Sequence, residues 1–132
     1  MTVRACAAII QKNGKILITQ RKRNQTFPLR WELPGGRIEP RESRESCLKR
    51  EIKEEVGVCI TAPRLYCTRR FRIKKNTLQI YYYLCRIMRG KPRRLEVNRL
   101  RWIAPSQHKN YNFLSPDRSV LERLVEDTVR AR

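Results

Sequence analysis

The chain has 132 residues, of which 31 are Lys or Arg and 12 are Asp or Glu, so its formal net charge is +19. The length predicts a single domain spanning residues 1–132, and an apolar content of 40% predicts a folded core and excludes a disordered chain. The longest apolar run near the start, Ala5 to Ile10, is too short for a signal-peptide core or a membrane span, so we expect a soluble, cytoplasmic protein with no membrane partner.

The first predicted elements are two strands that pair as a hairpin. Residues 3–11 and 15–20 are apolar or β-branched runs, and Asn13-Gly14 lies between them. Asn and Gly both tolerate a positive φ, which makes this dipeptide a strong hairpin signal. The polar stretch at residues 21–26 is expected to be a loop.

A short strand and a helix are predicted next. The strand covers residues 31–33 and ends at Pro34-Gly35-Gly36, where proline stops pairing and the glycines permit a tight backbone path. Ser43 is the predicted N-cap of a helix that runs to about Val56, and Gly57 is expected to end it in a left-handed conformation. Apolar residues recur at four-residue spacing on the face expected to contact the core: Leu48, Ile52 and Val56.

The second half of the chain predicts three strands and a final helix. Residues 64–74 alternate, with apolar side chains on one face and cationic side chains on the other, and Asn76-Thr77 is a predicted turn. Residues 78–88 are apolar on both faces, as in a central strand, and residues 99–103 form a short strand. Ser115 is the expected N-cap of the last helix, with Pro116 at its first position. This order predicts an α/β (α+β) fold with helices packed on a mixed sheet.

Cysteine and histidine usage restricts the chemistry. The five cysteines are odd in number and form no C-x-x-C pair, which favours reduced thiols over disulfides or a zinc site. The single histidine, His108, lies in a polar stretch and is expected in a solvated loop. Nucleophilic catalysis through a Ser-His or Cys-His pair would therefore depend on that one residue.

The acidic residues are concentrated in one segment. Seven of the twelve lie within residues 32–55, whereas residues 56–95 contain eleven Lys or Arg and no acid. The predicted helix places Glu51, Glu54 and Glu55 on one face at spacings i, i+3 and i+4. Pairing with Arg50 and Lys53 would make this an ordinary mixed-charge surface. Alternatively, a hard divalent cation such as Mg²⁺ would neutralise the three carboxylates.

The surrounding spacing favours the metal. Residues 36–58, GRIEPRESRESCLKREIKEEVGV, resemble the Nudix box, G-x5-E-x7-R-E-U-x-E-E-x-G-U, at every specified position. The resemblance implies a Nudix-type α/β/α sandwich with a mixed β-sheet and a loop-helix-loop catalytic motif. It also implies dependence on Mg²⁺, with Mn²⁺ as a substitute, and hydrolysis of a nucleoside diphosphate linked to another moiety.

The resemblance also implies roles for single residues. Arg50 is implied to orient Glu51, a catalytic residue, and the Gly35 carbonyl is implied to be one of the metal ligands. The carboxylates implied to bind metal are Glu51, Glu54 and Glu55. Structural roles in the motif fall to Gly36, Glu42 and Gly57.

The similarity extends over most of the chain to MutT-like nucleoside triphosphate pyrophosphohydrolases. Arg21 matches a nucleotide-contacting arginine, although it could also be one more solvated arginine. Glu96 matches a distant glutamate that completes the metal cluster or acts as general base. Asp117 matches the position that reads the base, or it has a purely structural role at the helix start. MutT itself has asparagine there, so cytosine and normal or oxidised guanine all remain open as bases.

The implied reaction releases a nucleoside monophosphate and pyrophosphate, as in nucleotide-pool cleaning. A metal-bound water attacks the β-phosphorus, with Glu51 or Glu96 as base. The candidate pocket walls are aromatic or apolar: Leu33, Ile73, Leu78 and Tyr81.

Two rival functions use the basic residues instead. A Nudix enzyme could remove pyrophosphate from 5′-triphosphorylated RNA or cleave dinucleoside polyphosphates, with the cations of residues 56–95 following the phosphate chain. A non-catalytic module could use a basic sheet face to bind nucleic acid. The simplest alternative for these cations is a solvated surface that keeps the protein soluble.

Overall fold

The computed structural model describes residues 1–131. Its helices are α1 (Arg44–Val56) and α2 (Ser115–Arg130), with a 3₁₀ helix, η1 (Pro105–Asn110), before α2. The strands are β1 (Thr2–Lys12), β2 (Lys15–Gln20), β3 (Trp31–Glu32), β4 (Gly35–Arg37), β5 (Cys59–Ile60), β6 (Arg64–Ile73), β7 (Asn76–Cys85), β8 (Ile87–Arg89) and β9 (Arg99–Ile103).

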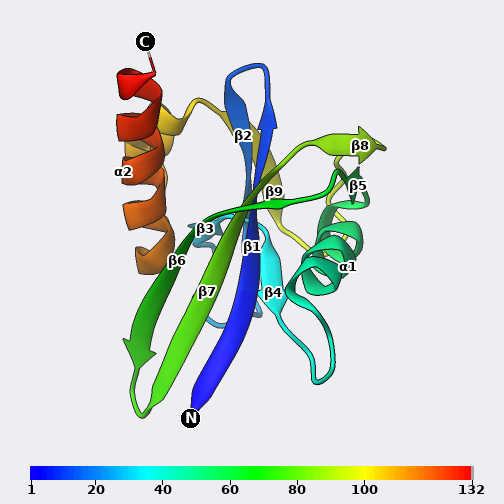
Figure 1. The fold of residues 1–132 in the computed structure, drawn as a ribbon, viewed down its shortest axis with the longest axis vertical. Coiled ribbons are helices and arrows are strands. Elements are labelled where there is room, and N and C mark those ends of the chain that lie inside the picture. The colour runs from blue at the N-terminus through cyan, green and yellow to red at the C-terminus, as the bar shows by residue number, and fades with distance from the viewer. Residues whose placement is uncertain (132) are drawn as a thin grey trace.

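Seven strands form one mixed sheet. The main order is β3-β2-β1-β7-β6, while β4 pairs with β1 and β9 pairs with β2. β1 and β7 are parallel and the other pairs in this sheet are antiparallel. β5 and β8 form a separate two-stranded sheet. Figure 1 shows α1 and α2 on opposite sides of the strands, so the predicted α/β/α sandwich with a mixed sheet is confirmed.

Side chains of β1 point alternately to the two faces of the sheet, which explains why the molecule has two cores. Ala7 and Ile9 pack in the core under α2, whereas Cys6, Ala8 and Ile10 pack in the core under α1. Successive side chains of a strand point to opposite faces, so a strand that is apolar at every position has to be covered on both sides. The uninterrupted apolar run near the N-terminus is therefore the centre of the sheet.

The predicted hairpin and the predicted ends of α1 are confirmed. β1 and β2 pair antiparallel across Asn13-Gly14, and both residues have positive φ. The Ser43 hydroxyl accepts a hydrogen bond from the Ser46 N–H at 3.1 Å. Gly57 is left-handed with φ +74°, and its N–H donates to the Lys53 carbonyl at 3.0 Å. Local capping residues therefore fix both ends of the helix.

The tight backbone path predicted at the two glycines is confirmed, and it lies within a strand. Gly35 and Gly36 begin β4, which pairs antiparallel with β1, and neither has positive φ. Gly35 is required for close approach, because a Cβ there would lie 2.0 Å from the Cys6 carbonyl oxygen. The missing side chain thus lets β4 pack directly against β1.

The predicted boundaries around β6 and β7 need correction. The turn lies at residues 74–75, and Asn76-Thr77 already belong to β7, so the tight loop comes two residues earlier than predicted. A bulge between Leu65 and Cys67 shifts the alternation of β6. Leu65 is consequently 45% exposed instead of facing the core. The predicted strand at residues 78–88 divides into β7 and β8, which lie in different sheets.

Two predictions near the C-terminus were also wrong. Ser115 is the first residue of α2, and the N-cap is Leu114, whose side chain makes no capping hydrogen bond. His108 is only 8% exposed and lies in η1 instead of a solvated loop. The polar sequence around His108 gave no sign that η1 packs against α2.

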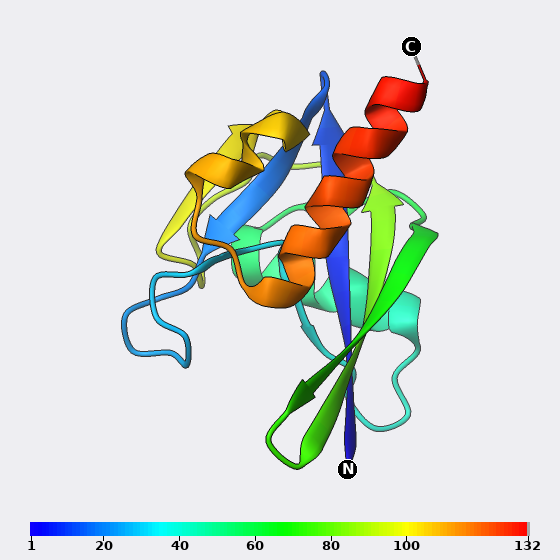
Figure 2. The ribbon, with the colours of Figure 1, turned by 90° about the vertical axis from the view of Figure 1, so that its left-hand side faces the viewer.

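One end of the molecule extends beyond both helices. The N-terminus and the turn between β6 and β7 project together at this end, as Figures 1 and 2 show. The ends of β1, β7 and β6 on this side therefore extend past α1 and α2. Neither helix in residues 1–131 has the length and apolarity that crossing a membrane requires.

Candidate active site

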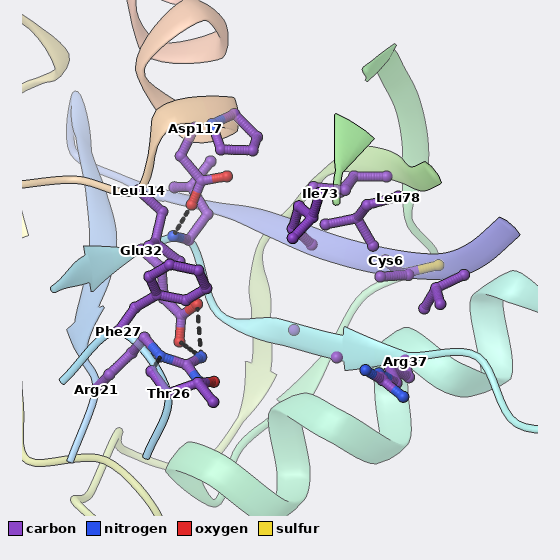
Figure 3. A pocket seen from close by; sticks show the side chains of 18 of the residues that line it. Cys6, Arg21, Thr26, Phe27, Glu32, Arg37, Ile73, Leu78, Leu114 and Asp117 are labelled. Atoms are coloured by element: carbon purple, nitrogen blue, oxygen red, sulfur yellow. Dashed lines mark hydrogen bonds and ion pairs between the residues drawn. The ribbon is translucent and has the colours of Figure 1, made fainter. Parts of the chain in front are cut away.

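A pocket lies on the α2 side of the sheet, where β1, β7 and β3 meet the start of α2. Its volume is about 360 Å³. Figure 3 shows Arg21, Glu32 and Asp117 along one wall and Ile73 and Leu78 along the opposite wall. One wall is therefore polar and charged, whereas the other is apolar.

Asp117 is held rigidly on the polar wall. Its Oδ2 accepts a hydrogen bond from the Leu33 N–H at 2.8 Å, and its Oδ1 accepts one from the Tyr82 hydroxyl at 2.6 Å. The side chain is only 6% exposed, and this burial raises the pKa of Asp117 to about 6, although both hydrogen bonds act in the opposite direction. The predicted base-reading residue therefore lines the pocket and also ties α2 to β7 and to the residue that follows β3.

Arg21 lies further along the same wall, in the loop after β2. Its Nη1 is 3.2 Å from Glu32 Oε2, and its Nε donates to the Thr26 carbonyl at 2.7 Å. The structure thus places Arg21 in the pocket wall and excludes a freely solvated arginine. Sequence reasoning missed Glu32, whose burial raises its pKa to about 7 despite the charge of Arg21. The sequence feature that could have identified Glu32 is its position as a single acid between two apolar residues of a short strand.

The apolar candidates are divided between the two faces of the sheet. Leu33, Ile73 and Leu78 line the pocket, as predicted. The prediction for Tyr81 was wrong, because it packs against the core under α1, on the other face of the sheet. Leu78 and Tyr81 are three residues apart, an odd number, so they point to opposite faces of β7. Phe27, in the loop before β3, was missed as a pocket residue.

Arg50 organises the acidic motif. Its Nε donates to Glu42 Oε2 at 2.7 Å, and its Nη1 donates to Glu51 Oε1 at 2.9 Å. The same Nη1 lies 3.3 Å from Glu54 Oε2. Hydrogen bonding from Arg50 lowers the pKa of Glu42 to about 2. One guanidinium therefore links the loop after β4 to two successive turns of α1.

Glu55 is buried, and Glu51 beside it in the motif is partly buried. Glu55 Oε2 accepts a hydrogen bond from the Gly35 N–H at 3.1 Å. Burial raises the pKa of Glu55 well above its ordinary value, and the charges of Glu32 and Glu51 raise it further. Burial likewise raises the pKa of Glu51, against the effect of its hydrogen bond with Arg50. A Cβ on Gly36 would lie 2.3 Å from the Glu51 carboxyl carbon, so this glycine makes room for the carboxylate.

Glu96 reaches the same place from a distant part of the chain. It lies in the loop between β8 and β9, and its N–H donates to the Glu55 carbonyl at 3.1 Å. Its negative charge contributes to the raised pKa of both Glu51 and Glu55. The structure therefore brings Glu96 to the last turn of α1, where the Gly35 N–H also contacts Glu55.

The carboxylates suit a hard divalent cation, although they do not form a finished coordination sphere. Within residues 1–131, no three acidic, His or Cys side chains converge closely enough to hold a metal ion. Arg50 holds Glu51 and Glu54, while the Gly35 N–H holds Glu55. The donor set is nonetheless all oxygen, and repulsion among these carboxylates adds to the effect of burial in raising the pKa of Glu51 and Glu55. A cation would relieve that repulsion once these side chains turned toward it.

Comparisons with known proteins give a consistent result. A sequence model described as the NUDIX domain matches residues 1–124. The chain is 28% identical over 123 residues to the CTP pyrophosphohydrolase of Escherichia coli (strain K12), covering 93% of this chain and 91% of that protein. It is 32% identical over 116 residues to the 8-oxo-dGTP diphosphatase of Buchnera aphidicola subsp. Schizaphis graminum (strain Sg), covering 88% of each. The crystal structure of a MutT NUDIX hydrolase from Burkholderia pseudomallei superposes with a TM-score of 0.81 at 28% identity, covering 92% of this chain and 97% of that one.

Proposed function

The chain belongs to the NUDIX domain family and is a Nudix hydrolase, and from that premise we propose that it hydrolyses a nucleoside triphosphate to a nucleoside monophosphate and pyrophosphate. The observation that carries the proposal is the position of the pocket. Gly35 and Gly36 line it and also touch Glu55 and Glu51. A nucleoside in the pocket would therefore present its phosphates to the carboxylates.

The polar wall supports a base with hydrogen-bond donors. Asp117 and Glu32 offer carboxyl groups, and an ionised carboxylate can only accept hydrogen bonds. The amino group of cytosine and the N1–H with the 2-amino group of guanine both fit this requirement. Relatives at about 30% identity include enzymes named for CTP and for 8-oxo-dGTP. We therefore propose one of these bases, with cleaning of the nucleotide pool as the role if the base is oxidised.

The proposed cofactor is Mg²⁺, with Mn²⁺ as a substitute, held by the carboxylates and by the Gly35 carbonyl. The carboxylates concerned are Glu51, Glu54, Glu55 and Glu96. When bound, the ion supplies positive charge that offsets the charge developing on the phosphate oxygens.

The protein's own groups carry the proton transfer. Glu51 or Glu96 takes a proton from a water whose oxygen forms a bond to the β-phosphorus, and the bond from that phosphorus to the α–β bridging oxygen breaks. The raised pKa of Glu51 brings it nearer to neutral pH, where a general base works best. Arg50 positions Glu51, and Arg21 binds the nucleotide.

A pyrophosphate-release screen tests the proposal. Release of pyrophosphate from normal, oxidised and methylated nucleoside triphosphates is measured in the presence of Mg²⁺ and in the presence of EDTA. We expect Mg²⁺-dependent release from at least one of them.

Glu54→Gln should lower kcat/KM by at least 100-fold. Glu45→Gln changes an exposed glutamate of α1 outside the cluster and should leave kcat/KM unchanged. Near-normal turnover by Glu54→Gln would refute the metal assignment. Hydrolysis in ¹⁸O-water should label pyrophosphate, and label in the monophosphate would refute attack at the β-phosphorus.

A second candidate is a substrate with a longer phosphate chain, and a specific feature favours it. Arg94, in the same loop as Glu96, lines two cavities whose charged side chains are all cationic: Lys22 and Arg23 in one, and Arg93, Arg99 and Arg101 in the other. Its Nη1 donates to the Asn98 carbonyl at 3.3 Å, which holds the side chain over the loop. Dinucleoside tetraphosphate and 5′-triphosphate RNA therefore belong in the same screen. Turnover of either above that of every nucleoside triphosphate would establish this candidate.

A further inference from the structure

A row of arginines crosses the sheet on the face opposite to the pocket. Arg4 of β1, Gln79 of β7 and Arg70 of β6 are in register across three neighbouring strands. Gln79 is two residues from Tyr81, which packs on the α1 side of the sheet, so this row points to the α1 side. Arg70 Nε donates to Gln79 Oε1 at 2.7 Å, which holds it across the strands. Arg72 lies one row further toward the projecting end.

Tyr81 fixes two guanidinium groups at the upper edge of this row. The Arg44 guanidinium carbon lies 4.4 Å from the centroid of the Tyr81 ring, and that of Arg4 lies 5.4 Å from it. Both distances are within the range of a cation–π interaction. Hydrogen bonding from Arg4 also lowers the pKa of the Tyr81 hydroxyl. We call these residues, Arg4, Arg44, Arg70, Arg72, Gln79 and Tyr81, the arginine face.

No ion pair in the described part of the chain holds the arginines of the arginine face. Among residues 1–131, the arginines that form ion pairs with carboxylates are Arg21, Arg50 and Arg123, and none of these belongs to the face. Arg4 and Arg44 lie against the same ring, and Arg70 and Arg72 lie on one strand, so like charges are held near one another and repel. A bound anion would therefore stabilise this arrangement.

The spacing of the arginines favours an anion with several phosphates. Arg70 and Arg72 are two residues apart on one strand, about 7 Å, and Arg4 and Arg70 are two strands apart, about 10 Å. A single phosphate cannot contact all of them, whereas consecutive phosphates of a chain can. A guanidinium also donates two parallel hydrogen bonds to a phosphate, a geometry that lysine lacks. Because Tyr81 is already stacked by arginines, the face offers phosphate contacts and no free ring for a base.

We propose that the arginine face binds the phosphodiester backbone of nucleic acid, independently of base sequence and apart from the catalytic pocket. The pocket lies on the other side of the same strands, lined by Val3, Leu78 and Ile80, so both sites can be occupied together. This proposal does not depend on the substrate of the enzyme. It gives part of the net charge of +19 a specific role.

The test is fluorescence anisotropy with a labelled oligothymidylate of about 20 nucleotides, titrated at several salt concentrations. We expect binding whose log affinity falls linearly with log salt. The triple variant Arg4→Gln/Arg70→Gln/Arg72→Gln should weaken binding by at least 10-fold at fixed salt and reduce the salt slope by about 2, since about 0.7 counterion is released per phosphate contact on a single strand.

A matched control separates this site from the overall charge. Arg64→Gln/Arg86→Gln/Arg130→Gln removes the same three charges from exposed positions outside the face and should bind nearly as well as the unchanged chain. Equal losses in both triple variants would overturn the proposal, and so would an absence of oligonucleotide binding. Binding to anionic phospholipid vesicles but not to the oligonucleotide would likewise overturn it. Thermal unfolding checks that each variant folds, so the result stands whether or not a nucleotide substrate is found.

Discussion

Arg50 shows how one residue can serve both the fold and the site. It pairs with Glu42, which holds the loop after β4, and also with Glu51 and Glu54 of α1. In this arrangement the guanidinium balances the carboxylates that we propose as metal ligands. Since a divalent cation would compete for the same oxygens, Arg50 would keep its bond to Glu42 while its contacts with the other two weaken.

The two neighbouring glycines should respond differently to substitution. In Gly36→Ala the atoms nearest to the new Cβ all belong to the end of the Glu51 side chain, the first at 2.3 Å, and that side chain can move. We therefore expect a large loss of kcat with little change in thermal stability. In Gly35→Ala the Cβ meets the Cys6 carbonyl oxygen at 2.0 Å, so β4 itself has to shift. That variant should lose several kcal/mol of stability, measured by urea unfolding. A Gly36→Ala protein that is strongly destabilised, or a Gly35→Ala protein of unchanged stability, would contradict these contacts.

The pKa of Glu32 predicts a pH dependence of stability. Its value of about 7 in the folded protein exceeds the ordinary 4.5, so the folded state binds more protons between these pH values. Its contribution to stability is complete below pH 4.5 and is lost as the pH rises through 7. Glu32→Gln should remove this loss. The free energy of unfolding of the variant minus that of the unchanged chain should therefore be about 3 kcal/mol larger at pH 8 than at pH 4.5. Urea unfolding in EDTA at both pH values measures this difference, and an unchanged difference would contradict the burial of the ionised carboxylate.

At the scale of elements, the acidic motif depends on where α1 begins and ends. The helix runs from its cap at Ser43 to the left-handed Gly57, and the loop carrying Glu96 is hydrogen-bonded to its last turn. Arg93 N–H donates to the Val56 carbonyl, and Leu95 N–H donates to that of Glu55. These bonds satisfy carbonyls that a helix end would otherwise leave unpaired. The end of α1 therefore positions the distant glutamate.

Removing the N-cap should destabilise α1 without abolishing the site. Ser43→Ala deletes the acceptor for the Ser46 N–H, which typically costs about 1 kcal/mol. Ser43→Asp keeps an acceptor and should retain the stability. Urea unfolding of both variants tests this, and equal stabilities would show that the cap contributes nothing. Turnover of the folded Ser43→Ala protein should be close to normal because the hydroxyl touches none of the carboxylates proposed as ligands.

At the scale of the whole molecule, the charges are sorted by position. Carboxylates gather around α1 and the pocket, whereas cations cover the surrounding surface, including the arginine face and the cavities beside Arg94. The basic surroundings would attract a highly charged triphosphate toward the carboxylates. Repulsion among these cations also destabilises the folded state.

Self-repulsion predicts that salt stabilises the protein. Raising NaCl from about 10 mM to about 100 mM shortens the Debye length from about 30 Å to about 10 Å, which screens repulsion among exposed cations. We expect the Tm to rise by a few degrees over this range, measured by circular dichroism at neutral pH. The triple variant of the arginine face should show a smaller rise because it carries three fewer positive charges. A Tm that falls with salt would mean that attractive surface pairs dominate.

Elements with local signals were predicted well. The hairpin at Asn13-Gly14 and both ends of α1 depend on residues whose conformational preferences act within a few positions. Where the signal was not local, prediction failed. The bulge after Leu65 and the burial of His108 depend on what other segments pack against them, and the sequence near each gives no sign of those neighbours.

The sequence by itself determined the family, the acidic helix and the residues proposed for the chemistry, because spacing along a helix fixes which carboxylates share a face. Only the tertiary structure decided which groups from other segments contact these residues. It brought Glu96 to the end of α1 and placed Glu32 beside Arg21 and close to Asp117. It also separated Leu78 from Tyr81 by the thickness of the sheet, giving one face to the pocket and the other to the arginines. Contacts between distant segments arise from sheet order and packing, which no local pattern encodes.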